Sequence, residues 1–198
     1  MRMILASNNA HKAAELSAIL SGLGVETLTL RESGYHSDPE ETGTTFAENA
    51  YIKAKSLFDI SGEAVIADDS GLMVDALGGA PGVYSARYAG EGANDAENNK
   101  KLLKNLENTP DGERGAAFVS SICAILPDGR VLRAEGRCPG VILREAAGEN
   151  GFGYDPLFYM PELHKTFAEM SEEEKNAVSH RARALREFSR IFTEEMRK

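Results

Sequence analysis

The stretch MRMILASNNAHKAAELSAILSGLGVETLTL, residues 1–30, decides the fold, because it reads as a strand, a helix and a second strand in turn. Arg2–Ala6, which contains the apolar run Met3–Ala6, is typical of a short buried strand. The apolar side chains that follow recur at helical spacing, and this helix is expected to end near Gly22 or Gly24. A second strand is expected over Val25–Leu30. Strands alternating with helices predict an α/β protein.

The rest of the chain keeps this alternation and then changes character. Thr45-x-x-Glu48 is a capping-box pattern that predicts a helix reaching about Ile60. A hairpin signal, Pro127-Asp128-Gly129, appears later and favours a mixed sheet over a purely parallel one. The remaining expected elements are a polar loop over 31–43, strands over 64–67 and 72–77, a loop over 78–82, a helix over 94–106, hairpin strands over 116–126 and 130–136, a loop over 148–153, and a helical region from Ser171 almost to the C-terminus.

Composition and charge narrow the class of protein. The 198 residues are 42% hydrophobic and 27% charged, which is typical of a globular protein, and we treat residues 1–198 as one domain. Lys and Arg number 22 and Asp and Glu 31, so the net charge of −9 argues against non-specific nucleic-acid binding. The apolar run Met3–Ala6 is too short for a signal sequence or a membrane span. Cys123 and Cys138 match no metal or redox spacing, and Cys123 is interpreted as a buried small hydrophobe. We therefore expect a soluble protein of the reducing cytoplasm, without membrane or nucleic-acid partners.

A polar segment lies between the first strand and the first helix. Backbone N–H groups at a helix N-terminus attract anions, and Ser, Asn and Lys side chains add donors. A phosphate site and a plain N-cap turn both fit this pattern, which lacks the glycines of a phosphate loop. The segment consists of Ser7, Asn8, Asn9, Ala10, His11 and Lys12.

Two acidic pairs are candidates for a metal site. Glu40-Glu41 lie in the polar loop, and Asp68-Asp69 end an apolar strand, where ligands of α/β proteins usually bind. Mg²⁺ takes one or two carboxylates and completes its shell with water and phosphate oxygens. A solvated acidic turn is the alternative. A phosphatase of the haloacid dehalogenase type needs aspartates at i and i+2, and Ser70 follows Asp68 at that spacing, which argues against this rival.

Three further groups suggest a ligand pocket but are weak singly. Lys53 shares a helical face with Asn49, and its ammonium either contacts a phosphate or reaches solvent along the apolar surface. The glycines of Gly151–Phe158 allow close backbone approach, and its aromatic rings can stack on a base or pack in the core. Lys175 and Ser179-His180-Arg181 form either a donor-rich pocket or a basic helix face.

In this order, the motifs resemble one family closely. They are Ser-Asn-Asn-x-x-Lys, Glu-Glu-Thr-Gly-x-Thr-Phe-x-Glu-Asn-Ala, Ala-Asp-Asp-Ser-Gly-Leu, Gly-Gly-Ala-Pro-Gly-Val-Tyr-Ser-Ala-Arg-Tyr, Phe-Gly-Tyr-Asp-Pro and Ser-His-Arg. The chain resembles the inosine/xanthosine triphosphate pyrophosphatases from about residue 4 to residue 190. This family removes deaminated purine nucleotides such as ITP, dITP and XTP from the nucleotide pool, which keeps these bases out of DNA and RNA.

The resemblance implies a fold, a cofactor and a set of site residues. The fold is a mixed sheet with flanking helices, in two lobes around a central cleft. Members are usually homodimers and need Mg²⁺, which Glu40 and Asp69 are expected to bind, with Glu41 a neighbour left open. Asp69 matches the general base. The triphosphate is assigned to Ser7–Lys12 and Lys53, a further substrate contact to Ser70, and the base pocket to Phe152, Gly153, Tyr154, Asp155, Lys175, His180 and Arg181.

Two other functions compete with this one. A septum-formation-inhibitor-like pyrophosphatase shares the fold but prefers other nucleotides, and the Phe-Gly-Tyr-Asp and Ser-His-Arg motifs argue against it. A nucleotide-binding sensor without catalysis is the second, and the intact acidic pairs argue against that.

Overall fold

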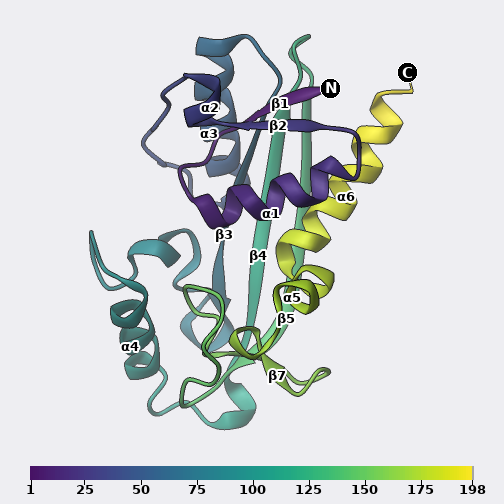
Figure 1. The fold of residues 1–198 in the computed structure, drawn as a ribbon. Helices are drawn as coiled ribbons and strands as arrows, with labels where there is room; N and C mark the ends of the chain where they lie inside the picture. The colour runs from purple at the N-terminus through teal and green to yellow at the C-terminus, as the bar shows by residue number, and fades with distance from the viewer. Residues whose placement is uncertain (198) are drawn as a thin grey trace. The chain divides into compact units, whose positions relative to one another are not determined.

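The computed structural model describes residues 1–197, and of His11 it describes the backbone only. Seven strands lie in the order β2-β1-β3-β4-β5-β6-β7 (Figure 1). Strand β1 pairs in parallel with β2 and β3, whereas β6 pairs antiparallel with β5 and β7, so the predicted mixed sheet is confirmed. The strands are β1 (Arg2–Leu5), β2 (Glu26–Thr29), β3 (Val65–Val74), β4 (Gly115–Ile125), β5 (Val131–Ile142), β6 (Phe158–Met160) and β7 (Lys165–Thr166).

Helices flank the sheet, as predicted. The α-helices are α1 (Ala10–Ser21), α2 (Leu30–Ser33), α3 (Phe46–Ser61), α4 (Asp95–Asn105), α5 (Glu172–Val178) and α6 (His180–Glu195). The 3₁₀ helices are η1 (Asp75–Leu77), η2 (Gly82–Arg87), η3 (Asp111–Glu113) and η4 (Phe167–Glu169).

The chain divides into two compact units, each with its own core. The first unit contains Met1–Ser70, Ser120–Gly136 and the chain from Arg181 onward, and the second contains Gly71–Val119 and Arg137–His180. Strands β3, β4 and β5 contribute residues to both units. The two lobes expected from the resemblance correspond to these units, whereas the cleft and the single domain over residues 1–198 stay predictions.

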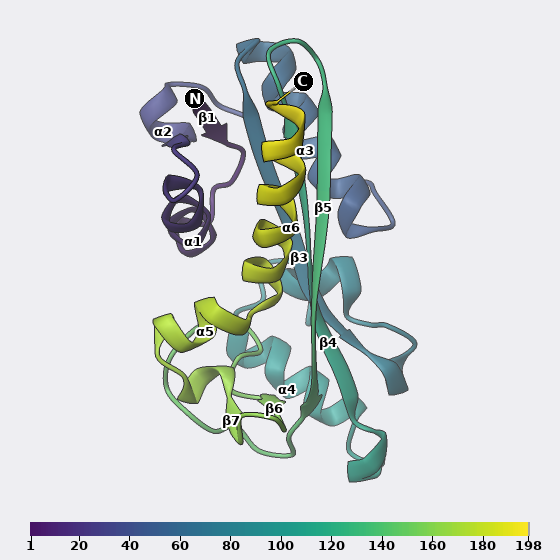
Figure 2. The ribbon, with the colours of Figure 1, turned by 90° about the vertical axis from the view of Figure 1, so that its right-hand side faces the viewer.

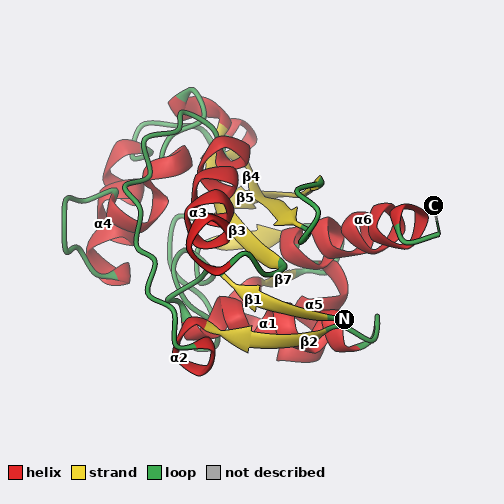
Figure 3. Ribbon diagram, turned by 90° about the horizontal axis from the view of Figure 1, so that it is seen from above, coloured by secondary structure: helices red, strands yellow, loops and turns green. Residues whose placement is uncertain are grey.

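In the first unit, apolar side chains cover both faces of the sheet. Helices α1 and α6 pack on one face, called here the α6 face, and α3 packs on the other, the α3 face (Figure 3). Successive strand residues alternate between the two cores, as a pleated strand requires. Ile66 of β3 belongs to the core under α6, and its neighbours Val65 and Ala67 belong to the core under α3. This alternation sets the direction of the polar residues that follow in β3.

Local caps fix where α3 begins and ends. The Thr45 side chain accepts a hydrogen bond from the Glu48 N–H at 3.2 Å, and the Glu48 carboxylate accepts one from the Thr45 N–H at 3.1 Å. The predicted capping box is thus confirmed. The helix ends at Gly62, whose φ of 64° lies in the left-handed region that glycine favours.

The second unit has an aromatic core. The Phe158 ring lies 4.6 Å from the Phe118 ring and 4.8 Å from the Phe167 ring, measured between centroids. Leu102 of α4 is buried in the same core. Figure 2 shows the short strands β6 and β7 together with α4 and α5, the elements that the second unit adds to β3–β5.

Several predicted boundaries are wrong, including the end of the strand expected over 130–136, because β5 continues to Ile142. Residues 64–67 and 72–77 are expected as separate strands, but β3 is continuous from Val65 to Val74, and its backbone passes close to η2 at Gly71. Residues 31–43 begin with the last turn of α2, whose capping box joins Thr29 and Glu32. The C-terminal helical region is broken at Ser179, which is extended with φ −62° and ψ 159°.

Both cysteines are buried free thiols, Cys123 in the first unit and Cys138 in the second. Burial raises the pKa of the Cys123 thiol to about 11, so this residue stays a neutral thiol at pH 7, in line with the predicted small hydrophobe. None of the described helices has the length and apolar character needed to cross a bilayer.

The close approach at Gly71 generates a stability prediction. A Cβ on Gly71 would lie 2.3 Å from the Ser85 Oγ and 2.7 Å from the Gly82 carbonyl oxygen, so Gly71→Ala should destabilise by about 1–3 kcal/mol. Gly112→Ala is the control, because a Cβ there meets no atom within 4 Å. Urea unfolding measures both, and equal effects of the two substitutions would contradict the packing argument.

Candidate active site

Two adjacent carboxylates of β3 are directed to opposite faces of the sheet. Asp68 follows the alternation of Ile66 and contacts residues on the α6 face, and Asp69 follows Ala67 and contacts α3. Both are buried, with 1% and 7% of their surface exposed. The two carboxylates therefore contact different helices, although Lys53 also acts to lower the pKa of Asp68 and Lys12 that of Asp69.

Asp68 is a fully buried anion surrounded by donors. Its Oδ2 lies 3.1 Å from the Lys12 Nζ and 3.6 Å from the Arg181 Nη2, and it accepts a hydrogen bond from the Ser70 hydroxyl at 3.2 Å. The Ser120 hydroxyl donates to the other oxygen. Burial would raise the pKa of Asp68, but Lys12 and Arg181, with the Ser120 hydrogen bond, hold that pKa far below its usual range. Asp68 is thus a permanent counter-ion for two cations.

Arg181 joins this centre from α6. Its side chain is 2% exposed, donates to the Ser70 Oγ at 3.1 Å, and forms an ion pair with Glu15 of α1. Glu15, in turn, is one helical turn from Lys12. Helices α1 and α6 are therefore tied to the end of the first unit's β3 segment by charge as well as by apolar packing.

Asp69 is the anion of the α3 face. Its Oδ1 accepts a hydrogen bond from the Lys53 Nζ at 2.8 Å, while its Oδ2 is buried and accepts none from any described residue. Burial raises the pKa of Asp69, and Lys53 and Lys12 offset that rise only in part. An acceptor that is buried without a donor costs free energy, so this oxygen can accept a further hydrogen bond or bind a cation.

Lys53 bridges two carboxylates. Its Nζ lies 2.8 Å from Asp69 and 3.2 Å from the Glu41 Oε1, and its side chain is 14% exposed. Burial lowers the pKa of Lys53, but the carboxylates of Asp69 and Glu41 outweigh it and raise that pKa, so the ammonium stays charged. Asn49, one turn earlier, accepts the Gly43 N–H at 2.8 Å and so ties the loop of Glu41 to α3. Of the two interpretations of Lys53, the structure excludes a freely solvated side chain.

The N-terminus of α1 is capped by its own sequence. The Asn9 side chain accepts the Lys12 N–H at 3.1 Å, and the Ser7 hydroxyl accepts the Asn9 N–H at 3.2 Å. The turn is therefore an N-cap, and the phosphate-site interpretation depends on the remaining N–H groups and on Lys12. Among the other residues predicted here, Asn8 and Ala10 are exposed, and the side chain of His11 lies outside the described residues.

The acidic groups fit a shared Mg²⁺ site better than a preformed cage. No cluster of three or more His, Cys, Asp or Glu side chains suited to a metal occurs among the described residues. The free Oδ2 of Asp69 is a hard oxygen donor, and one or two such carboxylates are enough when substrate phosphates supply further ligands. Glu41 is engaged by Lys53, whereas Glu40 is exposed.

In the second unit, Asp155 organises the predicted base pocket. Its Oδ2 accepts hydrogen bonds from the Lys175 Nζ at 2.7 Å and from the Phe152 N–H at 2.9 Å. The Lys175 Nζ also lies 4.7 Å from the Phe152 ring centroid. A Cβ on Gly151 would lie 2.1 Å from the Asp155 Oδ2, so this glycine allows close approach to a carboxylate rather than to a ligand.

Two predicted base-pocket side chains pack inside the second unit. Tyr154 is 4% exposed, and its hydroxyl donates to the Ser85 carbonyl at 2.8 Å. The His180 ring stacks on the Phe118 ring, with a centroid distance of 4.9 Å and an interplanar angle of 15°. Gly153, next to Tyr154, is held by helix α4 through its backbone. Six of the seven predicted base-pocket residues therefore lie in the second unit, and the seventh, Arg181, lies in the first.

Sequence reasoning missed the partners that position these groups. Glu15 and Ser120 contact Arg181 and Asp68 from 166 and 52 residues away. In the second unit, Asp95 and Asn99 bind Gly153 across 58 and 54 residues. No local pattern identifies such partners, because the distances along the chain exceed any helical or strand period.

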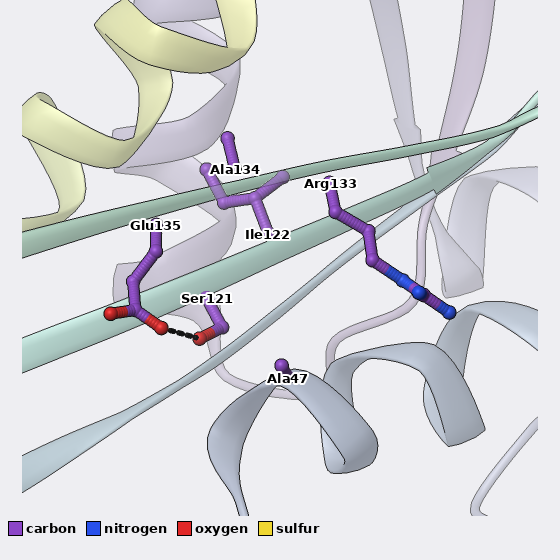
Figure 4. Close-up of a pocket in the computed structure, with 6 residues that line it drawn as sticks. All are labelled: Ala47, Ser121, Ile122, Arg133, Ala134 and Glu135. Carbon is purple, nitrogen blue, oxygen red and sulfur yellow. Dashed lines mark hydrogen bonds between the residues drawn. The ribbon is translucent and has the colours of Figure 1, made fainter.

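The first unit also has a pocket of about 260 Å³ on the sheet beside α3 (Figure 4). The Ser121 hydroxyl donates to the Glu135 carboxylate at 3.2 Å along its wall, and the Arg133 guanidinium lies 5.0 Å from the centre of the Tyr51 ring. None of the predicted site residues lines it. Its lining consists of Ala47, Ser121, Ile122, Arg133, Ala134 and Glu135.

Comparison with known proteins gives one consistent result. The Ham1 family model matches residues 3–191. A dITP/XTP pyrophosphatase of Desulforamulus reducens is 51% identical over 192 residues, which cover 97% of this chain and 96% of that protein. A dITP/XTP pyrophosphatase of Clostridium perfringens is 53% identical over 190 residues, 93% of each chain. The solved structure of a HAM1 protein from Coxiella burnetii has a TM-score of 0.90 at 44% identity and covers 98% of this chain and 99% of its own.

The burial of Asp68 generates a stability prediction. Asp68→Asn removes the anion but leaves Lys12 and Arg181 in place, so the free energy of unfolding at pH 7 should fall by about 3–5 kcal/mol. Because the pKa of Asp68 is lowered in the folded state, its contribution is complete above the ordinary carboxyl pKa of about 4 and declines below it. The gap between wild type and variant should therefore narrow as the pH falls below about 4.

Asp59→Asn is the matched control, because Asp59 pairs with Lys55 on the exposed side of α3. Such a surface pair contributes at most about 1 kcal/mol. Urea unfolding at pH 7, 5 and 3.5 compares the variants. An Asp68→Asn effect no larger than the control would show that Asp68 is not a buried counter-ion.

Proposed function

The chain belongs to the Ham1 family, and from that membership we propose that it hydrolyses the deaminated purine nucleotides dITP, ITP and XTP to the monophosphate and pyrophosphate. This reaction removes them from the nucleotide pool before they enter DNA or RNA. The observation that carries the proposal is Asp69, a buried carboxylate with a free oxygen beside the charged Lys53. A proton acceptor and a cation at one point are what attack on a phosphate requires.

The charges of the first unit support binding of a triphosphate. The substrate carries about four negative charges, and the protein has a net charge of −9, so attraction has to be local. Lys12 and Lys53 supply positive charge from α1 and α3, and each is held by one of the two adjacent aspartates. We propose that the triphosphate binds these lysines together with the α1 N-terminus, and that it contacts Ser70.

We propose that Mg²⁺ binds Asp69 and Glu40, the ligands implied by the family resemblance. The carboxylate chemistry of Asp69 supports its half of this assignment, because Mg²⁺ prefers hard oxygen ligands. Glu40 is exposed and has no side-chain partner among the described residues, whereas Lys53 already engages Glu41. When bound, Mg²⁺ neutralises phosphate charge and lowers the pKa of a coordinated water.

Asp69 is proposed as the general base. A water oxygen bonds to the α-phosphorus, the bond from that phosphorus to the bridging oxygen breaks, pyrophosphate leaves, and the proton of the water passes to Asp69. The free Oδ2 of Asp69 supports this role, because it accepts no hydrogen bond from any described residue. Lys53 holds the carboxylate in place and offsets charge on the departing pyrophosphate.

Donors of the predicted base pocket explain selection of the base. Hypoxanthine and xanthine present a 6-oxo acceptor, whereas adenine presents a 6-amino donor. Lys175 of the second unit can donate to the oxo group, and an amino group there would leave it facing another donor. Rejection of an unmatched hydrogen-bonding group reaches roughly 10⁴-fold. Asp155 holds Lys175 at 2.7 Å and supports its role as a positioned donor.

The same family resemblance also implies a cellular location and an oligomeric state. We propose a cytoplasmic homodimer. Light scattering that gives twice the chain mass of 21.4 kDa would support the dimer, and a monomer at micromolar concentration would exclude it.

Asp69→Asn tests the general base. We expect the fold to persist and kcat for dITP to fall at least about 100-fold, the lower range of general-base effects. Pyrophosphate release measures kcat, with Asp59→Asn as a fully active control. Retention of more than about a tenth of the rate would exclude Asp69 as the base.

Glu40→Gln and Glu41→Gln test the metal site as a matched pair. Loss of a ligand should raise the Mg²⁺ concentration for half-maximal rate at least about tenfold in Glu40→Gln. Glu41→Gln should leave this concentration nearly unchanged, because its carboxylate faces Lys53. A Mg²⁺ titration of dITP hydrolysis compares them, and the reverse order would assign the ligand to Glu41.

A further inference from the structure

Helix α4 holds both backbone polar groups of Gly153. The Asp95 Oδ2 accepts a hydrogen bond from the Gly153 N–H at 2.7 Å, and the Asn99 Nδ2 donates one to the Gly153 carbonyl at 2.9 Å. Asp95 and Asn99 are four residues apart, so they lie on one face of the helix. One acceptor and one donor thus fix the two peptide planes of a single glycine.

Helix α4, which carries Asp95 and Asn99, is itself held in place by several contacts. An Asn94–Glu97 capping box begins α4, and Leu102 is fully buried in the core of the second unit. Asn98 donates to the Ala86 carbonyl at 3.1 Å and so ties the helix to η2. The two hydrogen bonds to Gly153 therefore come from a helix whose own position is fixed.

Asn99 keeps its contact at a cost in stability. Its Oδ1 is buried and has no hydrogen-bond partner among the described residues. A rotated amide would place this oxygen against the Gly153 carbonyl, where two acceptors repel each other. An apolar residue would avoid the unsatisfied acceptor altogether, so the contact to Gly153 is the reason for an amide here.

Gly153 lies where the position of the loop matters most. Its φ of 63° lies in the left-handed region, a Cβ there would meet no atom within 4 Å, and hydrogen bonds from α4 hold both of its backbone polar groups. The preceding residue, Phe152, presents its ring 4.7 Å from the Lys175 Nζ. A shift at Gly153 would move this ring and its neighbouring peptide groups relative to Lys175.

We propose that Asp95 and Asn99 are positioning residues for selection of the purine base, which act through Gly153 on the ring of Phe152. The inference rests on the proposed function and adds two residues to it that do not touch the substrate. They set the distance between an aromatic surface and a donor, the two elements that recognise an oxo-purine.

The test is the ratio of kcat/KM for dITP to kcat/KM for dATP, which does not depend on the fraction of folded enzyme. Asp95→Ala should lower this ratio at least about tenfold, because misplacement by about 1 Å costs up to about 100-fold. Asp95→Asn keeps an acceptor oxygen, so its dITP-to-dATP ratio should be close to that of the wild type. Asn99→Ala removes the buried unsatisfied oxygen, so it should lower the ratio without lowering the Tm.

Glu97→Gln is the matched control, since Glu97 also carries negative charge in the first turn of α4 but binds Asn94 instead of Gly153. Its ratio should equal that of the wild type. An unchanged ratio in both Asp95→Ala and Asn99→Ala would overturn the inference, and if Asp95→Ala does not fold, Asn99→Ala decides alone. Absence of dITP hydrolysis in the wild type would instead refute the proposed function.

Discussion

The pleat of β3 is the constraint on which the candidate site depends. Because consecutive strand residues point to opposite faces, Asp68 and Asp69 cannot share one environment. Asp68 is surrounded by donors from α1 and α6, and Asp69 is paired with one lysine of α3. A single strand thereby fixes Lys12, Arg181 and Lys53, although these cations are far apart in the chain.

The two adjacent carboxylates have opposite pKa shifts. Donors hold the pKa of Asp68 down, so this residue stays ionised and keeps its cations in place. Burial raises the pKa of Asp69, and its second oxygen has no donor among the described residues. This oxygen can therefore accept a proton or a further hydrogen bond. In this protein of net charge −9, buried anions thus hold the positive charges of Lys12, Arg181 and Lys53 in place.

Sequence analysis found what is encoded locally. The first strand, its helix and the Thr45–Glu48 capping box depend on neighbouring residues, so periodicity and capping rules predicted them. The same reasoning expected separate strands over 64–67 and 72–77, and it missed the close approach of Gly71 to Ser85 within the continuous strand. The partners of the site, such as Glu15 for Arg181, come from distant segments that only the folded chain brings together.

The central claim is that water attacks the α-phosphorus of a deaminated purine triphosphate. The most direct measurement is hydrolysis of dITP by the wild-type protein with Mg²⁺ in ¹⁸O-labelled water, followed by mass spectrometry of the products. We predict one labelled oxygen in dIMP and none in pyrophosphate. Labelled pyrophosphate, or orthophosphate and dIDP as products, would contradict the account.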